Sequence, residues 1–409
     1  MVTGGRTGLS YTNVLTHDAL LAAAEAAAAA SDSVTTTGST ATGVNLRERS
    51  ASAVQRTSHP SFSVAPAEKI ELLRQIDDAA RAHDGAVKNV AIDHVAVEQQ
   101  VWVATTDGTM TTDERVRTRV TCRATAVRDG RTGAGFCGPG VGAGMELYEL
   151  HPPELIGVQA GDRAVVALEG RRSPSGAMPV ILGPSGGGLL VHEACGHGLE
   201  SDGFSRGTSA YSTRFGQQVG SSLITVMDDP TLPLAYGSYG CDDEGRNAGA
   251  TTLLDRGVLV GTLTDRDAAT TLSGGANGRR ESFAHGPLPR MSNTYIVAGQ
   301  SDPSAIIASV DNGVYVATLK GGDVDIITGD FSFTASEAYL IESGEVTVPF
   351  AGLTLLGNGA TALGSAAAVG NDLAFAQALC GKDGQWVPVS YGSPTLLIEG
   401  LAIAGGGRA

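Results

Sequence analysis

The sequence predicts an α+β protein in which N-terminal helices with a small antiparallel sheet precede a larger, β-rich C-terminal domain. Glycine supplies 56 of the 409 residues, which indicates many tight turns between short elements. Apolar residues recur at helical spacing early in the chain, whereas alternating, valine-rich segments typical of strands dominate from residue 84 onward. Because 409 residues exceed what one hydrophobic core usually fills, we expect an N-terminal α/β region over 1–150 and a C-terminal domain over 151–409.

Two helices are expected in the N-terminal region. An alanine-rich segment over 19–30 predicts the first helix, with Thr16 as its N-cap and Asp18 in its first turn. The small polar residues of 31–43 indicate a linker after it. Apolar residues then recur at helical spacing from Pro66 to Ala82, which predicts the second helix.

Strand patterns follow these helices. Alternation across 84–135, with a turn signal at Asp107–Gly108, predicts the small antiparallel sheet. Farther along, short Val, Leu and Ile runs between Gly and Asp turns predict more antiparallel strands, and 161–170 predicts a short helix or strand. Residues 179–188 predict a strand that ends in a glycine turn, and a helix over 189–200 is expected to leave that turn.

Composition excludes some classes of function. The net charge is −15, from 28 basic and 43 acidic residues, and no long run of one sign occurs. This argues against binding to nucleic acid or to an anionic membrane surface. The five cysteines do not form a compact disulfide framework, so a reducing cytoplasm fits best. The alanine-rich run is too short for a membrane span, and Glu25 interrupts it.

The motif that carries chemistry is His192–Glu193–x–x–x–His197. A hydrolytic metal site needs neutral imidazoles as ligands, a carboxylate beside the attacking water, and an open coordination position. Glu193 follows the first histidine, where such a carboxylate would stand. Two histidines buried in a core beside a helix end are the commoner explanation of such a motif when it stands alone.

The spacing of the two histidines predicts a local irregularity. A separation of five residues turns the second side chain about 140° around a regular α-helix, away from the first. A π-bulge would return both rings to one face. Alternatively, Gly196 and Gly198 would let the helix end between the ligands. We predict one of these two irregularities within 193–198.

Two histidines do not complete a metal shell, so a third ligand is required. Glu200 and Asp202 are local candidates, and Cys380 is a distant one. Free cysteines are usually buried as small apolar residues, and Cys195 is expected to be one of these.

Several long stretches make the chain resemble the TldD/PmbA metallopeptidase family, on the catalytic TldD side. The resemblance covers roughly residues 66–409 and is strongest from 174 onward. The stretches include TTDGTM, HEACGHGLESDGFSRGTSAY, CDDEGRNAGATTLLDRGVLVGTLTDR, NGRRESFAHGPLPRMSNTYI, GVYVATLKGGDVDIITGDFSFTASEAYLIESG and LCGKDGQWVPVSYGSPTLLIEGL.

The resemblance implies a zinc peptidase. It implies that His192, His197 and Cys380 hold the Zn²⁺ ion and that Glu193 is the general base. It also implies short or unfolded peptides as substrates, with roles in peptide maturation or natural-product biosynthesis. The expected partner is a second copy of the chain or a PmbA/TldE-like paralogue, in a dimer.

Two departures from the family pattern are visible. The family usually begins with a further α/β segment of several dozen residues, so region 1–150 is expected to hold truncated N-terminal and central parts. Region 151–409 is then the zinc-binding metallopeptidase domain. The stretch TLSGGANGRRES also stands where a TGNGRRES-like stretch is usual.

Four polar residues are candidates for substrate binding. Arg280, Arg290 and Asn293 could hold peptide carbonyls or a terminal carboxylate, because arginine binds carboxylates in a bidentate way. Asp243, in an acidic triplet, could lie near the substrate amine. Structural salt bridges or a solvated turn explain the same residues equally well.

Two other functions remain open at this stage. One is a zinc hydrolase that acts on an amide of a small biosynthetic intermediate. The other is a non-catalytic, zinc-stabilised partner subunit, against which an intact Glu193 argues.

Overall fold

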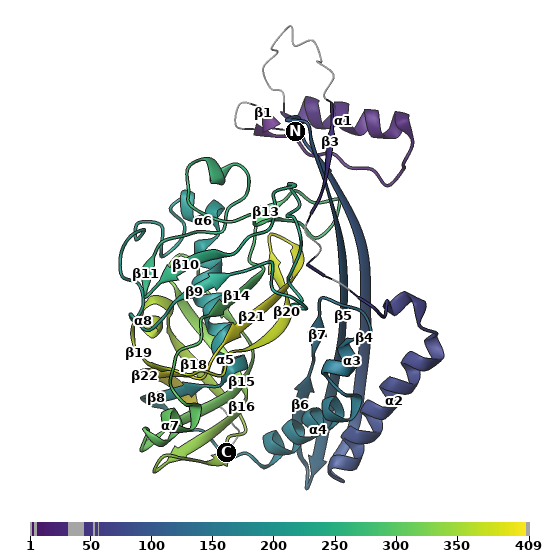
Figure 1. Cartoon of the computed structure of the whole chain (residues 1–409). Helices are drawn as coiled ribbons and strands as arrows, with labels where there is room; N and C mark the ends of the chain where they lie inside the picture. The colour runs from purple at the N-terminus through teal and green to yellow at the C-terminus, as the bar shows by residue number, and fades with distance from the viewer. Residues whose placement is uncertain (1, 4–5, 32–44, 52–53, 56, 406–409) are drawn as a thin grey trace.

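A computed structural model describes residues 2–3, 6–31, 45–51, 54–55 and 57–405, which form an α+β protein of two units (Figure 1). A long hairpin with helices beside it forms the first unit, and a compact, β-rich body forms the second. The predicted fold class is therefore confirmed. Among these residues, no helix combines the length and the apolar character that a membrane span requires.

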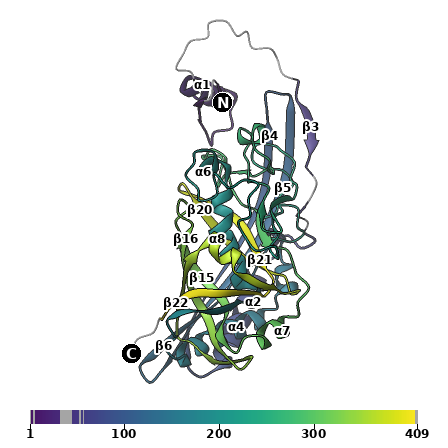
Figure 2. The ribbon, with the colours of Figure 1, turned by 90° about the vertical axis from the view of Figure 1, so that its left-hand side faces the viewer.

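A five-stranded sheet organises the first unit. Its order is β3-β5-β4, and β6 and β7 also pair with β5. Asp107 and Gly108 form the turn between the two long strands, where Gly108 has a φ of 89°. Figure 2 shows this hairpin running along the molecule until it lies beside β3. The strands are β3 (Arg47–Ser50), β4 (Val87–Ala104), β5 (Thr109–Arg128), β6 (Arg131–Cys137) and β7 (Gly140–Val141).

Both predicted N-terminal helices are present. Helix α1 spans His17–Ser31, and the hydroxyl of Thr16 accepts a hydrogen bond from Ala19 N at 3.4 Å, as an N-cap does. Helix α2 spans Pro66–His83. The linker predicted at 31–43 falls mainly outside the described residues. The short elements nearby are β1 (Val2–Thr3), β2 (Arg6–Thr7), the 3₁₀ turn Ser61–Ser63 and α3 (Leu147–Leu150).

Helix α4 (Pro153–Glu169) belongs to the first unit, which moves the expected boundary at 150/151. Its buried face shares a core with α2, β5 and β6. A Cβ at Gly157 would overlap the carbonyl of Ile76, so glycine lets the two helices approach closely. The division between the units therefore follows α4, and the segment 161–170 is the second half of this helix.

A closed barrel forms one half of the second unit. Its strands pair in the order β15-β8-β22-β18-β16, and β16 pairs again with β15. Strands β17 and β19 pair with β16 and β22. The strands are β8 (Gly176–Leu182), β15 (Asn312–Val324), β16 (Asp330–Glu342), β17 (Glu345–Pro349), β18 (Leu353–Asn358), β19 (Ala366–Val369) and β22 (Leu396–Gly405).

A six-stranded sheet, ordered β11-β10-β9-β14-β21-β20, forms the other half. The two halves share one apolar core. The strands are β9 (Val226–Asp228), β10 (Thr251–Asp255), β11 (Val258–Leu259), β14 (Asn293–Ile296), β20 (Ala374–Lys382) and β21 (Gln385–Ser393), and a separate pair is β12 (Gly278–Arg279) with β13 (Leu288–Pro289).

Helix α5 (Pro184–Val191) contacts both halves of the second unit, through β15 of the barrel and β21 of the other sheet. It begins at Pro184 and not at 189, so the glycines predicted as a turn lie inside the helix, where Gly187 and Gly188 pack directly on β21. The remaining short helices are α6 (Ser201–Ser205), a 3₁₀ turn (Ala268–Thr270), α7 (Pro303–Ala308) and α8 (Gly359–Gly364).

Candidate metal centre

A π-helical turn follows α5 and places the two histidines of the motif together. The turn spans His192–Gly196, and a 3₁₀ turn, His197–Leu199, continues from it. With about five residues in the π turn, His192 and His197 return to one face. Their ring centroids lie 5.2 Å apart. The irregularity predicted from the five-residue spacing is confirmed, and it takes the form of a π turn.

Close packing holds this turn in place. A Cβ at Gly196 would overlap the sulfur of Met291, so only glycine fits there without a shift. The hydroxyl of buried Tyr211 donates a hydrogen bond to the carbonyl of Ala194 at 2.9 Å. Cys195 is fully buried in the core, as expected of a packing residue.

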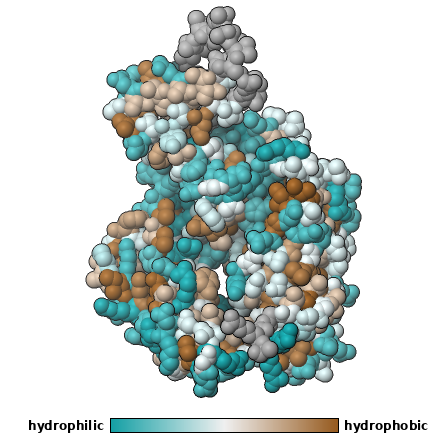
Figure 3. Space-filling view, turned by 180° about the vertical axis from the view of Figure 1, so that it is seen from behind, coloured by the Kyte–Doolittle hydropathy of each residue, from teal (hydrophilic) through white to brown (hydrophobic). Residues whose placement is uncertain are grey.

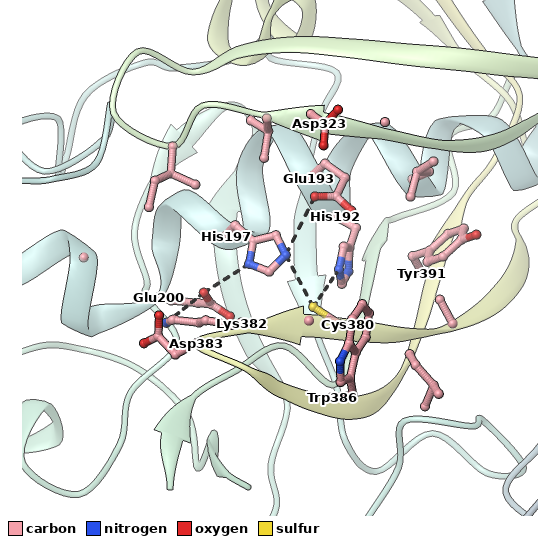
Figure 4. A pocket seen from close by; sticks show the side chains of 18 of the residues that line it. His192, Glu193, His197, Glu200, Asp323, Cys380, Lys382, Asp383, Trp386 and Tyr391 are labelled. Atoms are coloured by element: carbon pink, nitrogen blue, oxygen red, sulfur yellow. Dashed lines mark hydrogen bonds and ion pairs between the residues drawn. The ribbon is translucent and has the colours of Figure 1, made fainter. Parts of the chain in front are cut away.

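Strand β20 brings the thiol of Cys380 to the two imidazoles (Figure 4). Its Sγ lies 3.3 Å from Nε2 of His192 and 3.3 Å from Nε2 of His197. The three potential ligand atoms all lie within 4.8 Å of one another. The structure thus brings the distant candidate to the histidines.

The local candidates, Glu200 and Asp202, contact His197 and Lys382 and do not join the group of His192, His197 and Cys380. Glu200 Oε2 lies 3.1 Å from Nδ1 of His197, on the side of the ring away from Cys380. Asp202 Oδ1 lies 2.7 Å from Nζ of Lys382. Glu200 therefore orients a histidine, as carboxylates behind metal-ligating imidazoles do.

Electrostatics favour the ionised forms of Cys380 and Glu200, and the same two neighbours raise the pKa of His197. Burial raises the pKa of the Cys380 thiol, but the charges and hydrogen bonds of His192 and His197 outweigh it and lower that pKa to about 4. Burial likewise opposes ionisation of Glu200, yet His197, Lys382 and Arg290 lower its pKa to about 2. A thiolate is the form of cysteine that coordinates metals.

The donor set fits a divalent transition-metal ion. Imidazole nitrogens and a thiolate together suit such ions, whereas calcium and magnesium prefer oxygen ligands. All three donors are mostly buried, with His192 in the π turn, His197 at the start of the 3₁₀ turn and Cys380 in β20. Among the described residues, Nδ1 of His192 is buried without a hydrogen-bond partner.

Glu193 borders the space in front of these donors. Its Oε2 lies 3.7 Å from Nε2 of His197, and its side chain is 22% exposed. A cavity of 590 Å³ is lined by Glu193, His192, His197 and Cys380 together. The carboxylate is therefore within reach both of the candidate metal centre and of a molecule bound in the cavity.

Two regions that contain these elements match known family domains. Residues 59–168 match the PmbA/TldA metallopeptidase central domain, and residues 175–405 match the PmbA/TldA metallopeptidase C-terminal domain. The chain belongs to the PmbA/TldD metallopeptidase family. The division between the two matched regions falls after α4, where the two cores of the structure also separate.

Curated relatives in this family are named as metalloproteases. The metalloprotease TldD homolog of Haemophilus influenzae is 37% identical over 99% of this chain and 85% of its own length. A metalloprotease of Methanothermobacter thermautotrophicus is 34% identical over 86% of this chain and 77% of its own length. This chain is accordingly an enzyme of the metallopeptidase class.

Solved structures share the fold. TldE from Thermococcus kodakarensis superposes with a TM-score of 0.73 at 21% identity, over 97% of this chain and 87% of that one. A Thermotoga maritima protein superposes with a TM-score of 0.78 at 22% identity, over 98% of this chain and 87% of that one.

Lys382 and Tyr391 are two residues beside the candidate metal centre that the sequence analysis missed. Lys382 Nζ lies 3.0 Å from Glu200 and thus joins the network behind His197. It follows Cys380 by two positions in a strand, so both side chains lie on one face, which is a signal that could have found it. The Tyr391 ring lies 5.9 Å from that of His192, and burial raises its pKa to about 12.

The structure does not bring the four predicted substrate residues into this cavity. Arg290 is fully buried and donates to the carbonyl of Cys380 at 2.6 Å. Asn293 is fully buried as well, and its amide donates to the carbonyl of Asp229 at 2.6 Å. Both side chains therefore bond to the backbone of strands and loops around the site, which we call the frame.

Asp243 and Arg280 occupy a second, separate part of that frame. Asp243 lies 2.8 Å from Arg115 of β5 and accepts a hydrogen bond from the backbone N–H of Arg280 at 2.8 Å. Neither residue lines the 590 Å³ cavity. Asp243 therefore belongs to a charged network that joins the two units, and the substrate contact expected from its charge is not found in this cavity.

Proposed function

We propose that this chain is a zinc-dependent peptidase that hydrolyses short or unfolded peptides, with Glu193 as the general base. His192, His197 and Cys380 are the proposed zinc ligands. The observation that carries the proposal is the meeting of these three donors within 4.8 Å, beside a carboxylate and a cavity.

The distances between donors are compatible with a tetrahedral zinc site. Zn–N bonds of about 2.0 Å and Zn–S bonds of about 2.3 Å place tetrahedral donors roughly 3.5 Å apart. Cys380 Sγ lies 3.3 Å from each imidazole Nε2, close to that value. A relative from Saccharolobus solfataricus, 30% identical over 59% of this chain, is named a zinc metalloprotease TldD homolog.

Zinc, when bound, supplies Lewis acidity for the scissile carbonyl and lowers the pKa of water to about 7. Glu193 accepts the proton of the attacking water and later passes it to the leaving amine. Glu200 accepts a hydrogen bond from Nδ1–H of His197, which leaves Nε2 as the nitrogen with a free lone pair for the metal. Lys382 holds Glu200 in place from behind.

The size of the cavity supports a flexible substrate. A space of 590 Å³ accommodates a few residues of an extended chain but not a folded domain. The proposal therefore covers short or unfolded peptides, as in peptide maturation or natural-product biosynthesis.

We also propose a dimer and a cytoplasmic location. The shared fold with a TldE protein supports pairing with such a paralogue or with a second copy of this chain. All five cysteines are free and buried, which suits a reducing compartment.

The test compares the parent with Glu193→Gln on unstructured peptides and on amides of small molecules. We expect the parent to cleave peptides, and Glu193→Gln to lose about 10²–10⁴-fold in kcat/KM while it keeps its zinc. Glu345→Gln, on the exposed face of β17, is the matched control and should retain full activity.

Three results would contradict the proposal. Activity that survives complete removal of the metal would exclude the zinc mechanism. Cleavage of small-molecule amides without cleavage of peptides would replace the peptidase with an amide hydrolase. Equal activity of Glu193→Gln and the parent would remove Glu193 as the base.

A further inference from the structure

A second cavity, of 760 Å³, adjoins the candidate metal centre and is called the α4-side cavity below. Leu155 and Ile156 of α4 line one wall, and Leu319 of β15 and Phe375 of β20 line the opposite wall. Figure 3 shows the molecular surface hollowed between the lower parts of the two units. The cavity thus lies between the unit that carries α4 and the unit that carries the metal centre.

The α4-side cavity and the 590 Å³ cavity meet at the same side chains. Glu193, Leu189 and Tyr391 line both of them. A peptide whose bond is held at Glu193 would extend into one cavity with the residues before that bond and into the other with the residues after it. This reasoning rests on the proposed peptidase function, and it makes the α4-side cavity a substrate subsite.

The α4-side cavity is positively charged. Among the described residues that line it, Arg119, Arg163 and Lys320 are basic, whereas Glu193 is the sole carboxylate. The 590 Å³ cavity, by contrast, is bordered by several aspartates. A cavity with apolar walls and an excess of positive side chains favours a ligand that carries an anionic group.

Two of the three cations do not require such a ligand. Arg163 Nε lies 3.1 Å from Glu337, and Arg163 also donates to the carbonyl of Phe136 at 2.7 Å. Lys320 is exposed, so water can solvate its ammonium group. These two side chains add positive charge to the cavity, but their own charges are already balanced by Glu337 or solvated by water.

Arg119 differs, because the described residues supply no carboxylate partner within 4 Å of its guanidinium. Its Nε is buried and makes no hydrogen bond. Asp93, on the neighbouring strand, is bonded to Arg123 at 2.7 Å and to Thr121 at 3.2 Å. The terminal nitrogens of this half-buried guanidinium also make no hydrogen bond among the described residues, and Arg119 lines the cavity. A carboxylate bound there would give them charge-assisted hydrogen bonds.

We infer that the α4-side cavity binds a carboxylate-bearing part of the peptide substrate, with Arg119 as the partner of that carboxylate. An apolar residue beside the carboxylate packs between Leu155 of α4 and Leu319 of β15. The carboxylate is a free C-terminus or an Asp or Glu side chain, because both present the same two oxygens. Arg119 determines specificity and does not touch the reacting atoms.

Calorimetric binding of uncleaved peptides to the Glu193→Gln protein tests this inference. Three matched peptides of one apolar sequence are needed: one with a free C-terminus, one amidated, and one amidated with a single Glu. We expect the amidated neutral peptide to bind most weakly. Adding Arg119→Met should weaken binding of the carboxylate-bearing peptides at least about tenfold and leave the neutral peptide unchanged.

Two further variants isolate the role of the guanidinium. Arg123→Met removes an arginine from the same face of β5, where it is exposed and bonded to Asp93, so binding of all three peptides should persist. Arg119→Lys keeps the charge and should retain part of the preference for a carboxylate. Circular dichroism of each variant confirms that the fold is retained.

The peptides also distinguish the two sources of the carboxylate. Loss that is confined to the free C-terminus assigns the site to a chain end, and loss that is confined to the Glu peptide assigns it to a side chain. Equal binding of the three peptides to Glu193→Gln, no binding of any of them, or equal weakening of all three by Arg119→Met would overturn the inference. The proposed peptidase function fails separately, if the zinc-loaded parent cleaves none of them.

Discussion

Two clusters of buried charged side chains in this molecule differ in how completely their polar atoms are satisfied. The first surrounds the metal centre, where Glu200 and Lys382 lie behind His197. The second joins β5 to the second unit through Arg115. In that cluster, Nε of Arg115 lies 2.9 Å from Asp113, Nη1 lies 2.8 Å from Asp243, and Nη2 donates to the carbonyl of Cys241 at 2.7 Å.

The second cluster gives an acceptor to each of the three guanidinium nitrogens of Arg115, whereas several buried atoms of the first make no hydrogen bond. Nδ1 of His192 is one of them within the described part of the chain, and Oε1 of Glu200 and Nε of Arg290 face each other at 3.6 Å as an ion pair without a hydrogen bond. Satisfied networks hold elements together, and unsatisfied ones at a cavity are where ligands and metals bind. Of the two clusters, as far as the chain is described, only the one beside the cavity contains buried polar atoms without a hydrogen bond, although both clusters are built from arginines and carboxylates.

The largest expected effect on stability is that of Arg115→Met. This change leaves Asp113 and Asp243 buried without their cation, so it should lower the free energy of unfolding by about 3–5 kcal/mol. Zinc content per folded chain should stay at the parent value. Urea unfolding measures the first quantity, and elemental analysis of the folded fraction measures the second.

Arg123→Met is the matched control for that variant. It lies on the same strand, but both partners of its ion pair with Asp93 are more than half exposed. We expect a change of about 1 kcal/mol or less. If Arg115→Met were as stable as Arg123→Met, the second cluster would not be the structural joint described here.

A smaller effect, on the metal centre alone, is expected from Glu200→Gln. Without the carboxylate that accepts a hydrogen bond from Nδ1–H of His197, zinc affinity should fall about 10–100-fold. Competition with a chelator of known affinity measures this change. Asp202→Asn is the matched control, because Asp202 bonds Lys382 but makes no contact with either histidine. Equal affinities for the two variants would contradict the orienting role of Glu200.

The smallest effect concerns Glu146, a carboxylate in the first unit outside both clusters. Burial raises its pKa, but hydrogen bonds that include those from Ser58, Thr57 and His59 lower it to about 2. A lowered pKa means that Glu146 stabilises the fold above pH 4.5 and loses this contribution as the pH falls toward 2. Because the group is only partly buried and solvent screens its interactions, we expect about 1 kcal/mol.

The stability difference between the parent and Glu146→Gln tests this point. That difference should be present at pH 6 and should shrink progressively below pH 4.5, which chemical unfolding across a pH series measures. A difference that stays constant from pH 6 to pH 2.5 would show that the Glu146 carboxylate is not held in its charged form by the fold.

Local patterns predicted several elements well. The helix expected from Pro66 to Ala82 spans Pro66–His83, because its apolar periodicity matches the face that it buries. The π turn followed from the five-residue spacing of two histidines that were assumed to share a ligand. In both cases the information lies within one or two helical turns of sequence.

Other features depended on tertiary contacts that no local pattern carries. Gly157 of α4 and Gly187 of α5 argue against helix by propensity, yet each lies where a neighbouring element leaves no room for a side chain. Cys380 stands 183 residues from His197, and only the family resemblance singled it out in the sequence. Asp243 and Arg290 have side chains suited to substrate binding, but the fold buries both of them in contacts with Arg115 and with the carbonyl of Cys380.

Zinc content per chain, measured for the parent, Cys380→Ala and Cys195→Ala, tests the central claim most directly. Both cysteines are buried beside the motif, but only Cys380 lies at hydrogen-bonding distance from the histidines among the described residues. The account predicts one zinc ion in the parent and in Cys195→Ala, and a strong loss in Cys380→Ala. Full zinc in Cys380→Ala, or no zinc in the reconstituted parent, would contradict the proposed metal centre.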